Sequence, residues 1–161
     1  NGYAKRTKKM NFKINSIIMN KNFIRSGLAA TVVNLLLNAV ANFFILIHVH
    51  KAYPPISVEF QKQLVLPADQ LIGWALAVSA VTMGFFIALV IKWSGARTFD
   101  SGLKKGFVVA FLFWTSFNFG LYSSSNHFSL VGVLADLPCS VTAMTISAAV
   151  AAWILGKVKT T

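Results

Sequence analysis

The chain has 161 residues, of which 56% are hydrophobic and only 12% are charged. Soluble domains usually carry about 25% charged residues, so this composition excludes an ordinary water-soluble protein. One crossing of a bilayer needs about 20 apolar residues, and the chain therefore has room for about four spans and their connections. We predict an all-α, polytopic membrane protein, a bundle of four transmembrane helices.

Basic residues dominate the charge, because fifteen Lys and Arg stand against four Asp and Glu, a formal net charge of +11. Such an excess can indicate nucleic-acid binding, but here the basic residues lie between apolar runs, where they set membrane topology. We therefore expect no nucleic-acid partner. The single cysteine, Cys139, excludes an intrachain disulfide and every Cys-x-x-Cys redox or zinc motif.

Residues 1–26 contain seven of the basic residues and no acid. Isoleucines recur there at near-helical spacing with lysines between them, which favours a short helix lying on anionic lipid. A solvated basic tail is the alternative. We expect residues 27–161 to form one transmembrane domain.

Four apolar runs are predicted to cross the membrane, at residues 27–47, 71–91, 104–122 and 130–155. The first is longer than the apolar part of a signal peptide, so we interpret it as a retained signal anchor. The second has Trp74 and Trp93 near its ends, where indoles favour the interface. The third is apolar only from Gly106 and reaches full length if Lys104 and Lys105 extend toward the headgroups.

The basic residues lie almost entirely on one predicted side of the membrane. With four spans, the N-terminal segment, the second connection and the C-terminus share a face that collects thirteen of the fifteen. The opposite face holds only Lys51 and Lys62. Because cytoplasmic segments carry the excess of Lys and Arg, this pattern predicts that both termini are cytoplasmic.

Small residues spaced for close helix packing occur on the second and fourth predicted spans. Lipid tails are as apolar as leucine, so spans associate by close packing and hydrogen bonds. We expect these two helices to make the tightest contacts, within the chain or with another copy. The residues are Ala80, Gly84 and Ala88 on the second span and Ala143, Ser147, Ala148, Ala151, Ala152 and Gly156 on the fourth.

Polar residues recur at helical spacing on the first, third and fourth spans. An amide facing lipid would leave donors and acceptors unpaired at several kcal/mol each, so we predict one polar seam between these helices. The seam either fixes helix register by hydrogen bonding or forms a cavity for water, an ion or a small solute. Its candidate residues are Asn34, Asn38, Asn42, Asn118, Tyr122, Asp136 and Ser140.

Asp136, the acid inside an apolar run, has two interpretations. Because Leu137 and Pro138 follow it, it resembles a helix N-cap with a proline in the first turn. Residues 130–135 would then be an interfacial hook and the span would begin near Leu137. Alternatively, Asp136 is a functional carboxylate within the membrane.

The histidines His48, His50 and His127 fall on the outer face with Asp136 and Cys139. Their chemistry suits Zn or Cu, but the spacing offers no His-x-x-x-His pair, so we expect neither a metal nor another cofactor. Catalytic templates also lack parts, since an aspartyl peptidase needs a second intramembrane carboxylate and a serine nucleophile needs a base. We therefore predict that the protein is not an enzyme.

The stretch from Gly106 through Asn118 and Asp136 to Trp153-Ile154-Leu155-Gly156-Lys157 resembles, in layout, the C-terminal halves of small bacterial membrane proteins with four predicted spans. The resemblance implies a bacterial inner membrane and assigns no chemistry.

We expect a non-enzymatic subunit or scaffold, packed in a homo-oligomer or a larger membrane complex. Its predicted partners are the lipid bilayer, anionic lipid at the basic N-terminus, and other subunits or copies of itself. The alternative is a transporter or binding protein for a small polar solute or ion, using the polar seam.

Overall fold

The computed structural model describes residues 21–54, 66, 70–125 and 129–157, and the elements in these ranges are all helices. They are α2 (Lys21–Ala41), the π-helical segment η1 (Asn42–Leu46), α3 (Ile47–Ala52), α5 (Gly73–Trp93), α6 (Phe99–Ser124) and α7 (Leu130–Gly156). The segments α2, η1 and α3 form one continuous helix, so the described residues contain four helices long and apolar enough to cross a membrane. The predictions of an all-α fold and four candidate spans are confirmed.

Three of the four helices extend beyond the apolar runs that predicted them, whereas α5 begins and ends two residues later than its predicted run. Helix α6 begins at Phe99 because Thr98 and Ser101 form a capping box. The Thr98 side chain accepts from the Ser101 backbone N–H at 3.2 Å, and the Ser101 hydroxyl accepts from the Thr98 N–H at 3.1 Å. Of the predicted N-terminal segment, residues 1–20 lie outside the described residues, and residues 21–26 form the start of α2.

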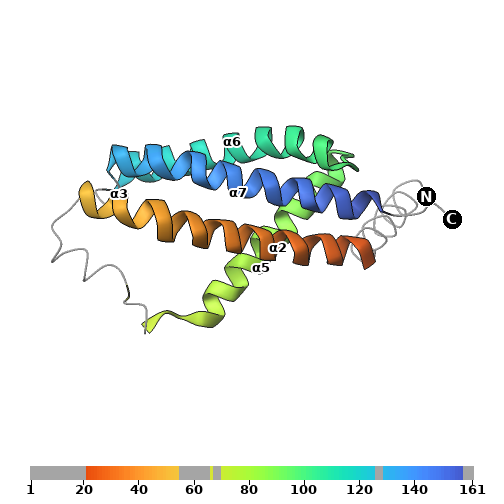
Figure 1. The fold of residues 1–161 in the computed structure, drawn as a ribbon, viewed down its shortest axis with the longest axis horizontal. Coiled ribbons are helices and arrows are strands. Elements are labelled where there is room, and N and C mark those ends of the chain that lie inside the picture. The colour runs from red at the N-terminus through yellow and green to blue at the C-terminus, as the bar shows by residue number, and fades with distance from the viewer. Residues whose placement is uncertain (1–20, 55–65, 67–69, 126–128, 158–161) are drawn as a thin grey trace, which may run out of the picture.

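Helix α7 is the centre of the bundle. It buries twelve residues, whereas α2, α5 and α6 bury four or five each. It contacts all three of these helices, and Figure 1 shows it lying between α6 and α2. The predicted small residues of α7 are buried except Gly156, and on α5 Gly84 and Ala88 are buried while Ala80 is half-buried.

The helices approach most closely where glycines meet small residues. A Cβ atom built on Gly102 would lie 2.6 Å from the Cβ of Ala152, and one built on Gly106 would overlap the Cβ of Ala148. On the other side of the bundle, a Cβ on Gly84 would overlap Thr31 of α2. The small faces of α7 and α5 therefore pack against helices of the same chain.

Helix α5 has two unlike halves. Its C-terminal half contains its four buried residues, Gly84, Ile87, Ala88 and Ile91. Its N-terminal half is exposed over most of residues 73–82, and Figure 1 shows this half diverging from the other helices. One end of the bundle is therefore built from α2, η1, α3, α6 and α7, without α5.

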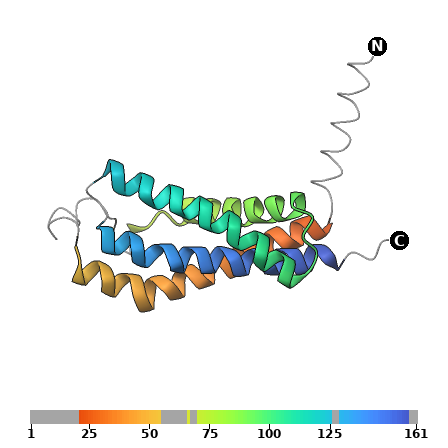
Figure 2. The same cartoon turned by 90° about the horizontal axis from the view of Figure 1, so that it is seen from above.

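The ends of the bundle carry different charge. The start of α2, the turn from α5 to α6 and the end of α7 lie at one end, as both views show (Figures 1 and 2). The end of α3 and the start of α7 lie at the other end. The described residues there include one Lys, Lys51, and no Arg. The first end carries Lys21, Arg25, Lys92, Arg97, Lys104, Lys105 and Lys157.

Candidate polar site between α6 and α7

The polar contact between α6 and α7 joins Asn118, Asp136 and Ser140. The Asn118 Nδ2 donates to Asp136 Oδ2 at 2.8 Å, and the Ser140 hydroxyl donates to Asp136 Oδ1 at 3.1 Å. Asn118 is 5% exposed and Ser140 is 3% exposed, while Asp136 is half-buried. Each carboxylate oxygen thus accepts one hydrogen bond from a buried neutral donor.

Asp136 lies inside α7 and does not cap it. The N-cap is Ser129, whose hydroxyl accepts from the Gly132 N–H at 3.0 Å. Asp136 lies six positions after Leu130 in the helix, about 9 Å along its axis at 1.5 Å per residue. The interpretation of Asp136 as a cap, with a hook over residues 130–135, is therefore wrong, because Ser129 provides the cap and the apolar residues after it continue the helix.

Pro138 lies within α7, one turn after Leu134. A proline in a helix removes one hydrogen bond to the carbonyl four residues earlier, and neighbouring helices make this tolerable in a membrane. The interpretation of Asp136 as a cap required Pro138 to lie in the first turn of a helix. In the structure, the packing of α7 against α2, α5 and α6 holds the helix together through the proline.

No basic side chain is ion-paired with Asp136 in the part of the chain that the structure describes. The basic residues described at this end of the bundle are His48, His50 and Lys51. Removing a carboxylate from water without a counterion is costly. The two hydrogen bonds offset part of that cost.

Asn34 and Asn38 of the first span hydrogen-bond each other. The Asn38 Nδ2 donates to the Asn34 carbonyl at 2.8 Å and to Asn34 Oδ1 at 3.2 Å, and both residues are half-buried. Asn42 is exposed and begins η1. Tyr122 is also exposed. Of the seven predicted seam residues, the structure joins three across the α6–α7 contact and two within α2.

Two polar atoms on α6 lie near Asn118 in the sequence and are buried without a hydrogen-bond partner, the Trp114 Nε1 and the Thr115 Oγ1. Trp114 is one helical turn before Asn118, so the two residues share a face of α6. Trp114 was not among the residues predicted for the site. Its i, i+4 spacing to Asn118 is the signal that would have selected it.

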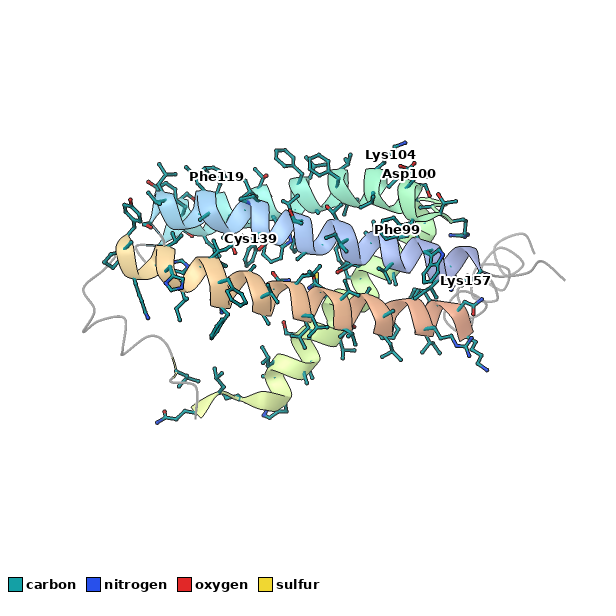
Figure 3. All side chains as sticks on the ribbon, viewed as in Figure 1. Phe99, Asp100, Lys104, Phe119, Cys139 and Lys157 are labelled. Carbon is teal, nitrogen blue, oxygen red and sulfur yellow. The ribbon has the colours of Figure 1, made fainter. Side chains whose placement is uncertain are left out.

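An open hollow lies on a different face of α7. It is an open, apolar groove of about 520 Å³ between α2, η1 and α7. Cys139 lies in it, on the side of α7 toward α2 (Figure 3). The lining residues are Leu37, Val40, Ala41, Ile45, Ala135, Pro138, Cys139, Thr142 and Ala143.

A second hollow of about 350 Å³ lies between α5 and α6. Ser79, Thr82, Met83 and Phe86 of α5 and Phe113 of α6 line it. Ser79 and Thr82 are exposed, and both belong to the half of α5 that diverges from the bundle. Hydroxyl groups therefore line part of an otherwise apolar opening.

The predicted outer histidines do not assemble with other ligands in the described part of the chain. His48 is exposed, and His50 packs against α7, since a Cβ on Gly132 would lie 3.2 Å from His50 Cε1. His127 lies outside the described residues. The described residues contain no group of three His, Cys, Asp or Glu suited to a metal ion.

No protein-family model matches this chain, and neither a curated protein nor a solved structure is significantly similar to it.

Proposed function

We propose that the protein is a small, non-enzymatic subunit or scaffold of a membrane complex, and that α5 is its docking helix. The observation that supports the proposal is the divergence of residues 73–82 from the other helices. A helix from another subunit can enter the opening beside this half and contact α5 and α6 together.

The chemistry of the opening suits a partner helix. Helices associate in lipid through close packing and interhelical hydrogen bonds, with serine and threonine as frequent contributors. Ser79 and Thr82 supply such hydroxyls, and Phe86 and Phe113 form an apolar floor. The rings of Phe86 and Phe113 are 5.8 Å apart between centroids, so the closed side of the opening is already packed.

The test is photo-crosslinking in native membranes, with p-benzoylphenylalanine placed at Ser79 or Thr82. We expect each position to give a product of defined mass with a second polypeptide, either another copy or a different subunit. Leu112 of α6, which is 63% exposed, is the matched control and should give no such product. Equal products at all three positions, or none at Ser79 and Thr82, would contradict the proposal.

We further propose that the protein resides in a bacterial inner membrane with both termini in the cytoplasm. The proposal is supported by the seven described basic residues at the end where α2 begins and α7 ends, since cytoplasmic segments carry such an excess. In a Cys139→Ser chain, an impermeant thiol reagent added to spheroplasts should label a cysteine at Ala52 but not one at Phe99. Labelling of both from outside would refute the orientation.

The Asn118–Asp136 contact favours a second candidate, a binding protein or transporter for an ion or small polar solute. Acidic groups within membrane spans mark ion and proton pathways in many proteins. Purified protein in vesicles loaded with a pH-sensitive dye tests this under a proton or sodium gradient. Asp136→Asn should abolish any flux while Asp100→Asn, at the end of the bundle, should preserve it. Absence of flux from the unaltered protein would remove this candidate.

A further inference from the structure

The turn between α5 and α6 is short and internally bonded. The Ser94 hydroxyl donates to the Ile91 carbonyl at 2.8 Å and accepts from the Ala96 N–H at 3.4 Å. Gly95 has a positive φ of 74°, which other residues rarely adopt. Ala96 is 1% exposed. The turn therefore has a defined shape and fixes the positions of the residues around it.

Three basic residues lie in or next to this turn, each on a different element. Arg97 belongs to the turn, and its Nη1 donates to the Ala96 carbonyl at 2.9 Å. Lys105 of α6 donates from Nζ to the Ser94 carbonyl. Lys157 follows the end of α7, where Gly156 packs directly on the Arg97 carbonyl. The turn, α6 and α7 thus each contribute one cation.

The local charge is not balanced by acids in the described part of the chain. Asp100 is the acid near the turn, and its Oδ2 lies 2.8 Å from the Lys104 Nζ (Figure 3). Arg97 and Lys105 bond to neutral carbonyls, and the Lys157 Nζ lies 3.3 Å from the centre of the Trp153 ring. Lys92 lies close enough to Arg97 for the two positive charges to interact, which adds to the local positive potential.

Exposed aromatic rings flank this turn. Trp93 precedes the turn and is 69% exposed, and Phe99 follows it and is 46% exposed. Trp153, beside Lys157, is 49% exposed. Tryptophan favours the membrane–water interface, and basic residues just beyond a span attract the anionic lipids there.

We propose that Arg97, Lys105 and Lys157 form a binding site for the phosphate of an anionic phospholipid. The guanidinium offers a planar pair of donors to phosphate oxygens, and the ammonium groups act as point charges. Because the cations come from the turn, α6 and α7, one bound headgroup bridges these elements and stabilises their contact. The site does not depend on the proposed function.

The test compares the full chain in phosphatidylcholine nanodiscs with and without phosphatidylglycerol. Thermal unfolding and native mass spectrometry report stability and retained lipid. We expect phosphatidylglycerol to raise Tm and to remain bound. Arg97→Gln with Lys105→Gln should lose the rise in Tm and bind about thirtyfold more weakly, since each basic residue near the surface contributes about a factor of five.

Matched variants distinguish lipid binding at this site from a general effect of charge and from misfolding. Lys21→Gln, at the same end on α2, and Lys51→Gln, at the opposite end, should keep the effect of the lipid. Arg97→Lys with Lys105→Arg conserves charge and should keep most of the binding. An equal loss in Lys21→Gln, or full lipid binding by the double glutamine variant, would overturn the proposal. Inorganic phosphate in phosphatidylcholine discs should not reproduce the stabilisation, and if it did, the site would be one for free phosphate.

Discussion

The α6–α7 pair is closely packed, whereas the N-terminal half of α5 is mostly exposed. Glycines and alanines bring α6 and α7 together, and Asn118 bonds Asp136 across the same contact. Residues 73–82 of α5 are similarly apolar but mostly exposed. Since lipid competes equally well for apolar side chains, hydrophobicity alone does not bring a helix into the bundle. Close approach and matched polar groups make the difference.

The largest effect should come from filling the glycine contact. Gly106→Leu should destabilise the protein by about 3 kcal/mol, because its side chain enters space held by Ala148 and strains a packed interface. Gly120→Leu on the same helix is the control, since a Cβ there meets nothing within 4 Å. Denaturant unfolding in detergent micelles measures both. Equal stability of the two variants would mean that the α6–α7 contact tolerates bulk and is not held by close approach.

An intermediate effect should come from the polar contact in the same interface. Asp136→Ala leaves the Asn118 amide and the Ser140 hydroxyl without their acceptor, at a cost of about 2 kcal/mol. Asp136→Asn should cost less, because its carbonyl still accepts one of the two bonds. Thermal unfolding of both variants gives the order. If Asp136→Asn proved the more damaging, the ionised carboxylate itself would be required for folding.

The smallest effect on the isolated chain should come from the open half of α5. Ser79→Leu and Thr82→Leu should change stability by less than about 0.5 kcal/mol, as for other exposed positions away from packed contacts. The same variants should lose their partner during purification in mild detergent. Retention of every co-purifying protein, together with unchanged stability, would show that this half of α5 faces only lipid.

The sequence predicted what depends on composition and spacing. Apolar length identified the four spans, and the i, i+4 relation of Asp136 and Ser140 placed both on the face of α7 that meets Asn118. The start of the fourth helix was harder to predict, because both Ser129 and Asp136 can cap a helix. In the structure the cap is Ser129. Which residue caps the helix depends on whether tertiary packing tolerates Pro138 inside it.

Features that depend on the relation between helices were not predictable. The small residues Ala80 and Gly84 lie on one line of α5, yet only Gly84 is buried, against Thr31. The small-residue spacing applies equally to both positions, and it does not specify the angle at which α5 crosses α2. The separation of Asn34 and Asn38 from the α6–α7 contact has a similar cause, since a ladder along one helix does not specify which neighbour it faces.

The π-helical turn η1 divides the first span into two registers. Such a turn behaves as one extra residue within an α-helix, and each residue of an α-helix turns the chain by about 100°. Deleting one residue between Asn42 and Leu46 would restore a regular helix and rotate α3 by that angle about the axis of α2. His50 would then leave its place against Gly132. The length of this short segment thus decides which side of the helix end meets α7.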